Sequence, residues 1–215
     1  MNTRELDTYT ASLQQCFGSS LLSVVLYGSA VNNPDDSANA NVLVVLSECP
    51  LLTLMKVKKI ADIAARARIE TLFWTKEEMK NAADVFPLEF TEITASHRIL
   101  AGTDIISGTK VTKTNMRHQI EFELRTKLLT LRRSYLDAGG NASRMRDALA
   151  DVSLIHLFKY AMKLAKISDP SMMVPLERCR DLKRGKVHLS AKALHVLFND
   201  IHEVLCTVIR AVDNA

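Results

Sequence analysis

The sequence predicts an α/β (α+β) domain with a small mixed sheet, followed by an all-α helical bundle. Two observations lead to this prediction. In the first half of the chain, short apolar runs typical of buried strands alternate with segments of helical periodicity. After residue 110, long helical segments follow one another without a further strand-like run. We therefore expect two domains, residues 1–110 and residues 111–215.

Hydrophobic periodicity separates the elements expected in the first domain. Apolar residues at helical spacing predict helices, whereas short runs of branched and aromatic residues predict strands. In order, these elements are a helix over 6–17, strands over 22–27 and 42–46, a helix over 51–67, and strands over 68–74 and 87–93. Thr75 and Glu78 have the spacing of a capping box, which predicts a further helix beginning just after Thr75.

The second domain is predicted to be helical throughout. A long helix over 116–136 ends at a Gly-Gly pair, which is a common helix stop. Residues 143–167 are apolar on nearly all sides, as expected for a helix buried in a bundle. A connecting segment over 168–189, with room for a short helix, leads to a last helix that Ser190 caps.

The polar residues that most often bind metals form no recognisable site in the sequence. The four cysteines are scattered without a paired spacing, so we interpret them as reduced thiols of a cytoplasmic protein. His188, His195 and His202 recur every seven residues, about 10 Å apart along a helix, which is too far for two of them to share one ion. We expect these histidines on a polar helix face and predict no bound metal.

The stretch from Leu21 to Ser47 carries the most specific pattern. An apolar run ends in Gly28-Ser29, a polar loop follows, and Asn39-Ala40-Asn41 opens a second apolar run. The pattern resembles the nucleotidyltransferase superfamily of the polymerase β type, in which Gly-Ser follows the first strand and Asp-x-Asp opens the second. The two-part plan is similar to that of small bacterial, kanamycin-type nucleotidyltransferases. The resemblance implies that Gly28 and Ser29 bind nucleotide phosphates.

Both positions that the resemblance assigns to catalytic aspartates are asparagines here, Asn39 and Asn41. Paired carboxylates on one strand face hold the Mg²⁺ ions that clamp a triphosphate and activate the attacking hydroxyl. An amide keeps one neutral oxygen ligand but supplies no negative charge. Asp35 and Asp36 are alternative ligands, although they lie in a turn-like string that no strand follows directly. We align Asn39 and Asn41 with the aspartates and expect a degenerate catalytic motif.

The resemblance implies a third acidic residue on a neighbouring strand. Glu89, in the Phe-Pro-x-Glu-Phe string of the predicted fourth strand, is our first candidate, with Glu92 and Glu70 as alternatives. On a strand, Glu89 and Glu92 would face opposite sides, so at most one of them could point at the site.

The composition gives no indication of a nucleic-acid or membrane partner. The net charge of +4 is mild and gives no specific nucleic-acid signal, and no run of apolar residues is long enough to cross a membrane. A nucleotide is the partner that the resemblance implies, and the helical domain could mediate a homodimer.

Two functions fit these patterns. The first is a catalytically degenerate nucleotidyltransferase-fold protein that binds a nucleotide, another ligand or a partner, without a cofactor. The alternative is an active nucleotidyltransferase that transfers a nucleoside monophosphate to a small molecule or protein, with Mg²⁺ held by the remaining acids. The missing charge favours the first, so we lean toward a protein that is not an enzyme.

Overall fold

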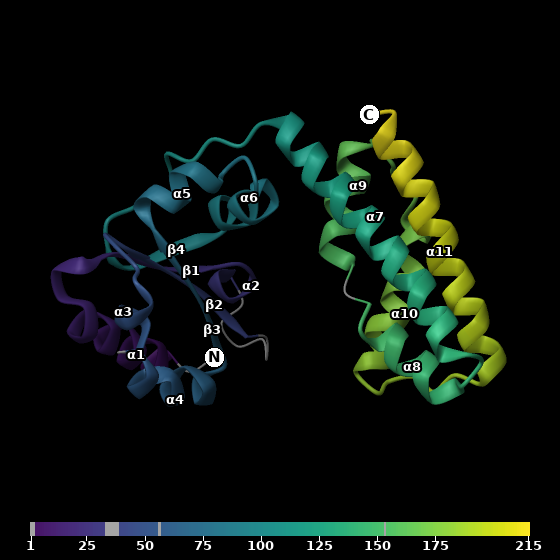
Figure 1. The fold of residues 1–215 in the computed structure, drawn as a ribbon, viewed down its shortest axis with the longest axis horizontal. Coiled ribbons are helices and arrows are strands. Elements are labelled where there is room, and N and C mark those ends of the chain that lie inside the picture. Colours follow the sequence, from purple (N-terminus) through teal and green to yellow (C-terminus); the bar gives the residue numbers. More distant parts are fainter. Residues whose placement is uncertain (1–2, 33–38, 56, 153) are drawn as a thin grey trace. The chain divides into compact units, whose positions relative to one another are not determined.

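A computed structural model describes residues 3–32, 39–55, 57–152 and 154–215 of the chain. The chain divides into two compact units, Met1–Met116 and Arg117–Ala215, and the boundary falls inside the long helix α7 (Lys113–Ala138). The first unit contains a four-stranded mixed sheet, and the second consists of helices (Figure 1). In the described ranges, no helix is both long enough and apolar enough to cross a membrane.

The sheet of the first unit has the strand order β3-β2-β1-β4. Strand β1 pairs antiparallel with both β2 and β4, whereas β2 and β3 run parallel. The elements of this unit are α1 (Thr3–Phe17), η1 (Gly18–Ser20), β1 (Leu21–Tyr27), α2 (Ser29–Asn32), β2 (Ala40–Leu46), α3 (Leu51–Met55), α4 (Lys58–Ala67), β3 (Ile69–Thr75), α5 (Lys76–Ala82), α6 (Pro87–Ala95) and β4 (His97–Gly102).

Helices cover both faces of this sheet, with α1 and α4 on one side and α5 and α6 on the other (Figure 1). Val24 and Val44 pack in the core shared with α1 and α4, whereas Val25 and Val45 pack against residues of α5 and α6. Burial on both faces explains why the two central strands read as continuous apolar runs and not as alternating patterns.

The prediction of a strand over 87–93 was wrong, because this segment is the helix α6 and the fourth strand is β4. Pro87 occupies the first turn of α6, where its fixed φ suits a helix and its missing N–H costs no hydrogen bond. Thr91 Oγ1 donates a hydrogen bond to the Pro87 carbonyl oxygen one turn back (2.7 Å). A short apolar run beside a proline is compatible with either element, and here the helical alternative forms.

Two other predicted helices are interrupted. The helix expected over 51–67 is divided into α3 and α4, and Arg68, expected to open β3, instead ends α4 in the left-handed conformation (φ 53°). The helix expected over 143–167 consists of α8 (Ala142–Ala150) and α9 (Ile155–Leu164). Asn141 caps α8 by accepting hydrogen bonds from the backbone N–H groups of Ser143 and Arg144.

The capping predictions are confirmed. Thr75 Oγ1 accepts a hydrogen bond from the Glu78 backbone N–H (3.0 Å), and Glu78 Oε2 accepts one from the Thr75 N–H (2.7 Å). Ser190 Oγ accepts a hydrogen bond from the Ala193 N–H (3.3 Å) at the start of α11 (Ala191–Asp213). The connecting segment contains η2 (Pro170–Met173) and α10 (Val174–Lys183).

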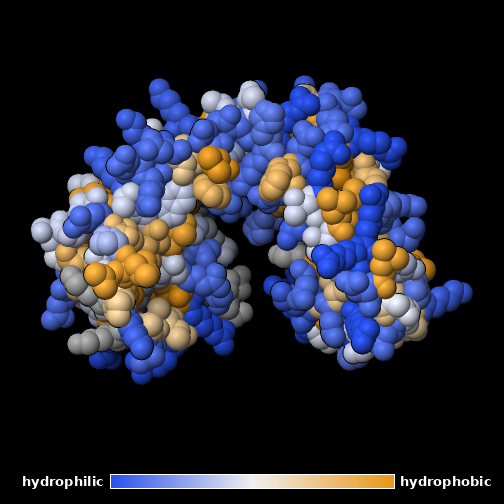
Figure 2. Space-filling model, viewed as in Figure 1, coloured by the Kyte–Doolittle hydropathy of each residue, from blue (hydrophilic) through white to orange (hydrophobic). Residues whose placement is uncertain are grey.

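The helical unit has its own apolar core. Leu124 of α7, Met145 of α8, Phe158 of α9 and Leu205 of α11 are fully buried. Cys179 of α10 is also part of this core, and burial raises the pKa of its thiol to about 12, so it behaves as an inert core residue. Apolar side chains also reach the surface of this unit, where they lie among hydrophilic ones (Figure 2).

The close pairing of β1 with β4 predicts a strong effect of Gly102→Ala. Gly102 has a φ of +81°, and a Cβ there would lie 2.1 Å from the Leu22 carbonyl oxygen. Backbone strain and overpacking together should lower the free energy of unfolding of this unit by about 2 kcal/mol or more. Urea unfolding followed by the fluorescence of the single tryptophan, Trp74, measures the change. Gly108→Ala is the control, since a Cβ there meets no described atom within 4 Å, and an equal loss in both variants would contradict the prediction.

Candidate functional site

The candidate site lies at one end of the sheet, where residues of all four strands stand in one row. Asn41 of β2 is paired with Tyr27 of β1 on one side and with Glu70 of β3 on the other, and Tyr27 is paired with His97 of β4. Residues directly opposite one another on adjacent strands share a face of the sheet. The row Glu70–Asn41–Tyr27–His97 therefore faces the same side as Leu43 and Val45, the side that α5 and α6 cover farther along.

Asn39 joins this row through a hydrogen bond. Its side-chain Nδ2 donates to Oε1 of Glu70, and both side chains are exposed. Asn39 lies two residues before Asn41 and directly precedes β2. The structure therefore brings Asn39, Asn41 and Glu70 together at the start of two parallel strands.

Gly28 directly follows β1 and lies beside Asn41. It has a φ of +79°, and a Cβ added to it would lie 3.4 Å from Asn41 Nδ2. Its backbone N–H donates to the Ser96 carbonyl oxygen (3.0 Å), and its own carbonyl accepts from the Val31 N–H (3.2 Å). Of the two residues expected to bind phosphate, Gly28 thus uses its N–H within the fold. Ser29 is exposed at the first position of α2.

Ser96 connects this turn to β4. Its Oγ donates to the Gly28 carbonyl oxygen (3.4 Å) and accepts from Asn32 Nδ2 (3.0 Å). These contacts join the ends of β1, α2 and α6, so the position of the Gly28-Ser29 turn is tied to the sheet.

Three glutamates lie around Tyr27. Burial raises the pKa of the Tyr27 phenol, and the negative charges of Glu92, Glu70 and Glu89 raise this pKa further. Because 87–95 is helical, Glu89 and Glu92 are three positions apart on α6 and neighbour each other on its surface, which corrects the expectation that they face opposite sides. The acidic residue on a strand beside Asn41 is Glu70, one of the two alternatives to Glu89.

Comparison with known proteins identifies the fold. The chain is similar over 99% of its length, at 12% sequence identity and a TM-score of 0.56, to all of a spectinomycin adenyltransferase from Enterococcus faecialis, whose crystal structure contains ATP and spectinomycin. This chain has the nucleotidyltransferase fold. No family model and no curated protein sequence matches it.

An apolar cavity of about 270 Å³ continues from the row of site residues. Leu43 and Leu72 line it, and they follow Asn41 and Glu70 by two residues on the same face of this nucleotidyltransferase fold. Trp74 forms part of the wall and makes edge-to-face contacts with Phe86 and Phe90, at centroid distances of 5.7 and 5.5 Å. Glu89 also lines the cavity, so a carboxylate stands beside an aromatic wall.

The donor set of this nucleotidyltransferase fold determines what it can bind. Within the described residues, no three His, Cys, Asp or Glu side chains are grouped as metal ligands. Asp35 and Asp36, the alternative ligands considered from the sequence, lie outside the described residues. The site offers amide groups from Asn39 and Asn41 and carboxylates from the glutamates. The amides can donate or accept hydrogen bonds, whereas the carboxylates accept hydrogen bonds and attract positive charge.

The contact between Asn39 and Glu70 predicts a pH-dependent effect of Asn39→Asp. The substitution places a second carboxylate beside Glu70, so the pair acquires a raised pKa in the folded protein. A raised folded-state pKa means that the folded protein binds protons more tightly than the unfolded chain. The deficit in stability is therefore present at high pH and disappears as the pH falls through this pKa.

Urea unfolding at pH 8 and at pH 5 tests this prediction. We expect Asn39→Asp to lose about 1 kcal/mol relative to wild type at pH 8, a modest value because both groups are exposed, and to lose less at pH 5. Asn39→Ala removes the same hydrogen bond without adding charge, so its loss should not depend on pH. An identical pH response of the two variants would show that Asn39 and Glu70 do not interact.

Proposed function

We propose that this protein is a catalytically degenerate member of the nucleotidyltransferase fold that binds a nucleotide or another small ligand at the Asn41 end of its sheet. The observation that supports the proposal most directly is the hydrogen bond from Asn39 to Glu70. Where the resemblance implies an aspartate that shares a metal ion with a third acid, this chain has an amide that donates to the remaining carboxylate.

As a consequence, the site attracts a cation less strongly than three carboxylates would. Three carboxylates around one ion repel each other when the ion is absent, whereas an amide donor satisfies a neighbouring carboxylate by itself. Mg²⁺ dehydrates reluctantly and is held by carboxylates together with substrate phosphates. Two neutral amides in place of two aspartates remove most of this attraction, and with it the means to activate an attacking hydroxyl.

The remaining charge of the site influences which ligand it prefers. Glu70, Glu89 and Glu92 all act on Tyr27, so the site is negative. A bare triphosphate is repelled by such a site, whereas a ligand rich in hydroxyl or amino groups is attracted to it. The spectinomycin adenyltransferase was crystallised with both kinds of ligand, ATP and spectinomycin.

The alternative is an active nucleotidyltransferase, in which glutamates of this cluster hold Mg²⁺ together with the substrate phosphates. The observation that favours it is that the charges of Glu92, Glu70 and Glu89 all act on Tyr27. The two functions differ in the role of Glu70. In the degenerate protein Glu70 accepts the Asn39 hydrogen bond and repels phosphate, whereas in the enzyme it is a metal ligand.

Glu70→Gln separates these functions by the sign of its effect. If the site is degenerate, removal of one negative charge should strengthen ATP binding severalfold, with or without Mg²⁺, in a calorimetric titration. Glu77→Gln, an exposed glutamate in the first turn of α5, is the matched control and should leave the affinity unchanged.

An active enzyme gives the opposite result. Mg²⁺-dependent release of pyrophosphate from ATP by the wild type, together with weaker MgATP binding and loss of release in Glu70→Gln, would overturn the proposal. The same titrations with spectinomycin as a positively charged probe should show weaker binding in Glu70→Gln than in the wild type.

A further inference from the structure

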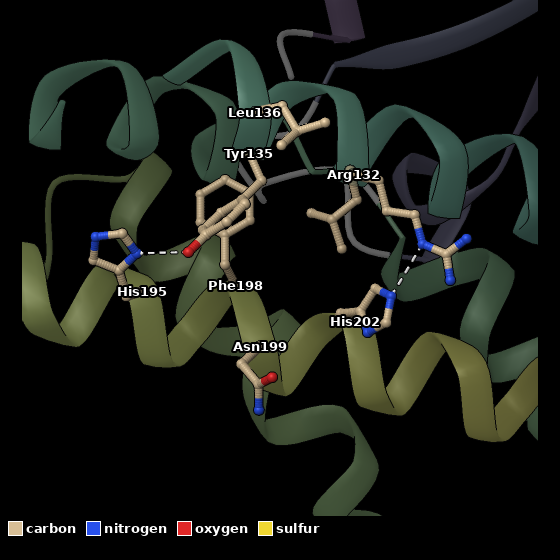
Figure 3. A pocket seen from close by; sticks show the side chains of 8 residues that line it. Arg132, Tyr135, Leu136, His195, Phe198, Asn199 and His202 are labelled. Atoms are coloured by element: carbon tan, nitrogen blue, oxygen red, sulfur yellow. Dashed lines mark hydrogen bonds between the residues drawn. The ribbon is translucent and has the colours of Figure 1, made fainter. Parts of the chain in front are cut away.

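The helical unit contains a cavity of about 430 Å³ between α7 and α11, separate from the candidate site in the first unit. Figure 3 shows the side chains that line it, with Arg132 and Tyr135 reaching in from α7 and His195, Phe198 and His202 from α11. Its volume falls within the range of about 300–1,000 Å³ that is usual for small-molecule sites.

An apolar wall forms the middle of the cavity. Leu131 and Phe198 are buried, with exposed fractions of 6% and 3%. The Tyr135 ring contacts Phe198 edge to face at a centroid distance of 5.2 Å and His195 at 5.7 Å. Aromatic side chains held in fixed orientations offer a flat surface at a low cost in conformational entropy.

Two hydrogen-bonded polar pairs flank this wall, one on each side (Figure 3). The Tyr135 hydroxyl and His195 Nδ1 are hydrogen-bonded at 3.0 Å. On the other side, Arg132 Nε donates to His202 Nε2 at 3.1 Å. His202 Nε2 also lies 3.9 Å from Cys206 Sγ. The Arg132–His202 bond uses the Nε–H group of the guanidinium, whose two Nη groups carry four further N–H donors.

Arg132 differs from two other arginines of α7 in the partner of its guanidinium. Arg125 pairs with Glu121 (3.0 Å) and Asp213 (2.9 Å), and Arg133 pairs with Asp137 (3.7 Å). Arg132 is hydrogen-bonded to the His202 imidazole, and no carboxylate is among the described residues that line the cavity. The cavity therefore combines an apolar wall with a cation that lacks an acidic partner in its lining.

We propose that this cavity binds an organic anion with a flat apolar body. The body lies against Leu131, Tyr135 and Phe198, and its carboxylate, sulfonate or phosphate group accepts hydrogen bonds from the Nη groups of Arg132. The Tyr135–His195 pair offers a hydrogen-bonding partner to the opposite end of the ligand. This site is independent of the proposed function, since it lies wholly in the helical unit.

Fluorescence titration with 8-anilinonaphthalene-1-sulfonate tests the proposal, because this probe has a flat apolar body and one sulfonate. We expect saturable binding at one site per chain in the wild type. Arg132→Met keeps the apolar stem but removes the charge, and it should weaken binding by tenfold or more. Arg133→Met, on the adjacent residue with its own acidic partner, should bind the probe as the wild type does. Circular dichroism confirms that both variants are folded.

Two further measurements locate the probe and define its recognition. N-phenyl-1-naphthylamine has the same apolar body without the sulfonate, so it should bind the wild type more weakly and be insensitive to Arg132→Met. Asn199→Trp, at an exposed residue of the cavity lining, should fill the cavity and prevent binding of both probes. Equal affinity of the sulfonated probe for wild type and Arg132→Met, equal affinity of the two probes for the wild type, or binding that survives Asn199→Trp would overturn the proposal.

Discussion

The pairing register of β2 is the constraint on which the candidate site depends. It places Asn41 opposite Tyr27 on one neighbour and opposite Glu70 on the other. A slip of one residue would turn every side chain of β2 to the other face and move Asn41 into the core shared with α1 and α4. The register is held because both faces of β2 are buried, from Val42 to Leu46. Packing in the middle of the sheet therefore determines which side chains stand together at its end.

The chemistry at that end is governed by charge. A nucleotidyltransferase fold with paired aspartates needs a cation to hold its carboxylates together. In this chain the Asn39 amide satisfies Glu70 directly, and the Asn41 amide packs against Gly28. The geometry brings two strands and a turn together, and under the proposed function neutral amides stand there in place of the carboxylates that would bind magnesium.

Much of the fold could be predicted from the sequence, because buried strands and amphipathic helices have distinct periods. The α/β class, the helical second half and the two caps at Thr75 and Ser190 followed from local patterns, as did the likeness to nucleotidyltransferases. The segment over 87–95 could not be assigned by periodicity, because a short apolar run that begins with a proline fits a strand or a helix. That error also led us to place Glu89 on a strand.

Other features depend on contacts between distant segments. Glu70 was recognisable as a polar residue near the start of a strand, but only the parallel pairing of β2 with β3 shows that it stands beside Asn41. The seven-residue spacing of His195 and His202 was visible, and we expected a polar helix face. Their contacts with Tyr135 and Arg132 arise from the packing of α11 against α7, which the sequence does not display. His188 precedes α11 and is not part of this arrangement.

The central claim is that two amides have replaced a magnesium site, and thermal denaturation of Asn39→Asp/Asn41→Asp with and without Mg²⁺ tests it most directly. The double variant restores two carboxylates beside Glu70 at nearly constant side-chain volume. We predict that it melts below the wild type without Mg²⁺ and is stabilised when Mg²⁺ is added, while the wild type shows no shift, because only the variant gains stability from binding the ion. An equal Mg²⁺-dependent shift in the wild type, or no shift in the double variant, would contradict the account.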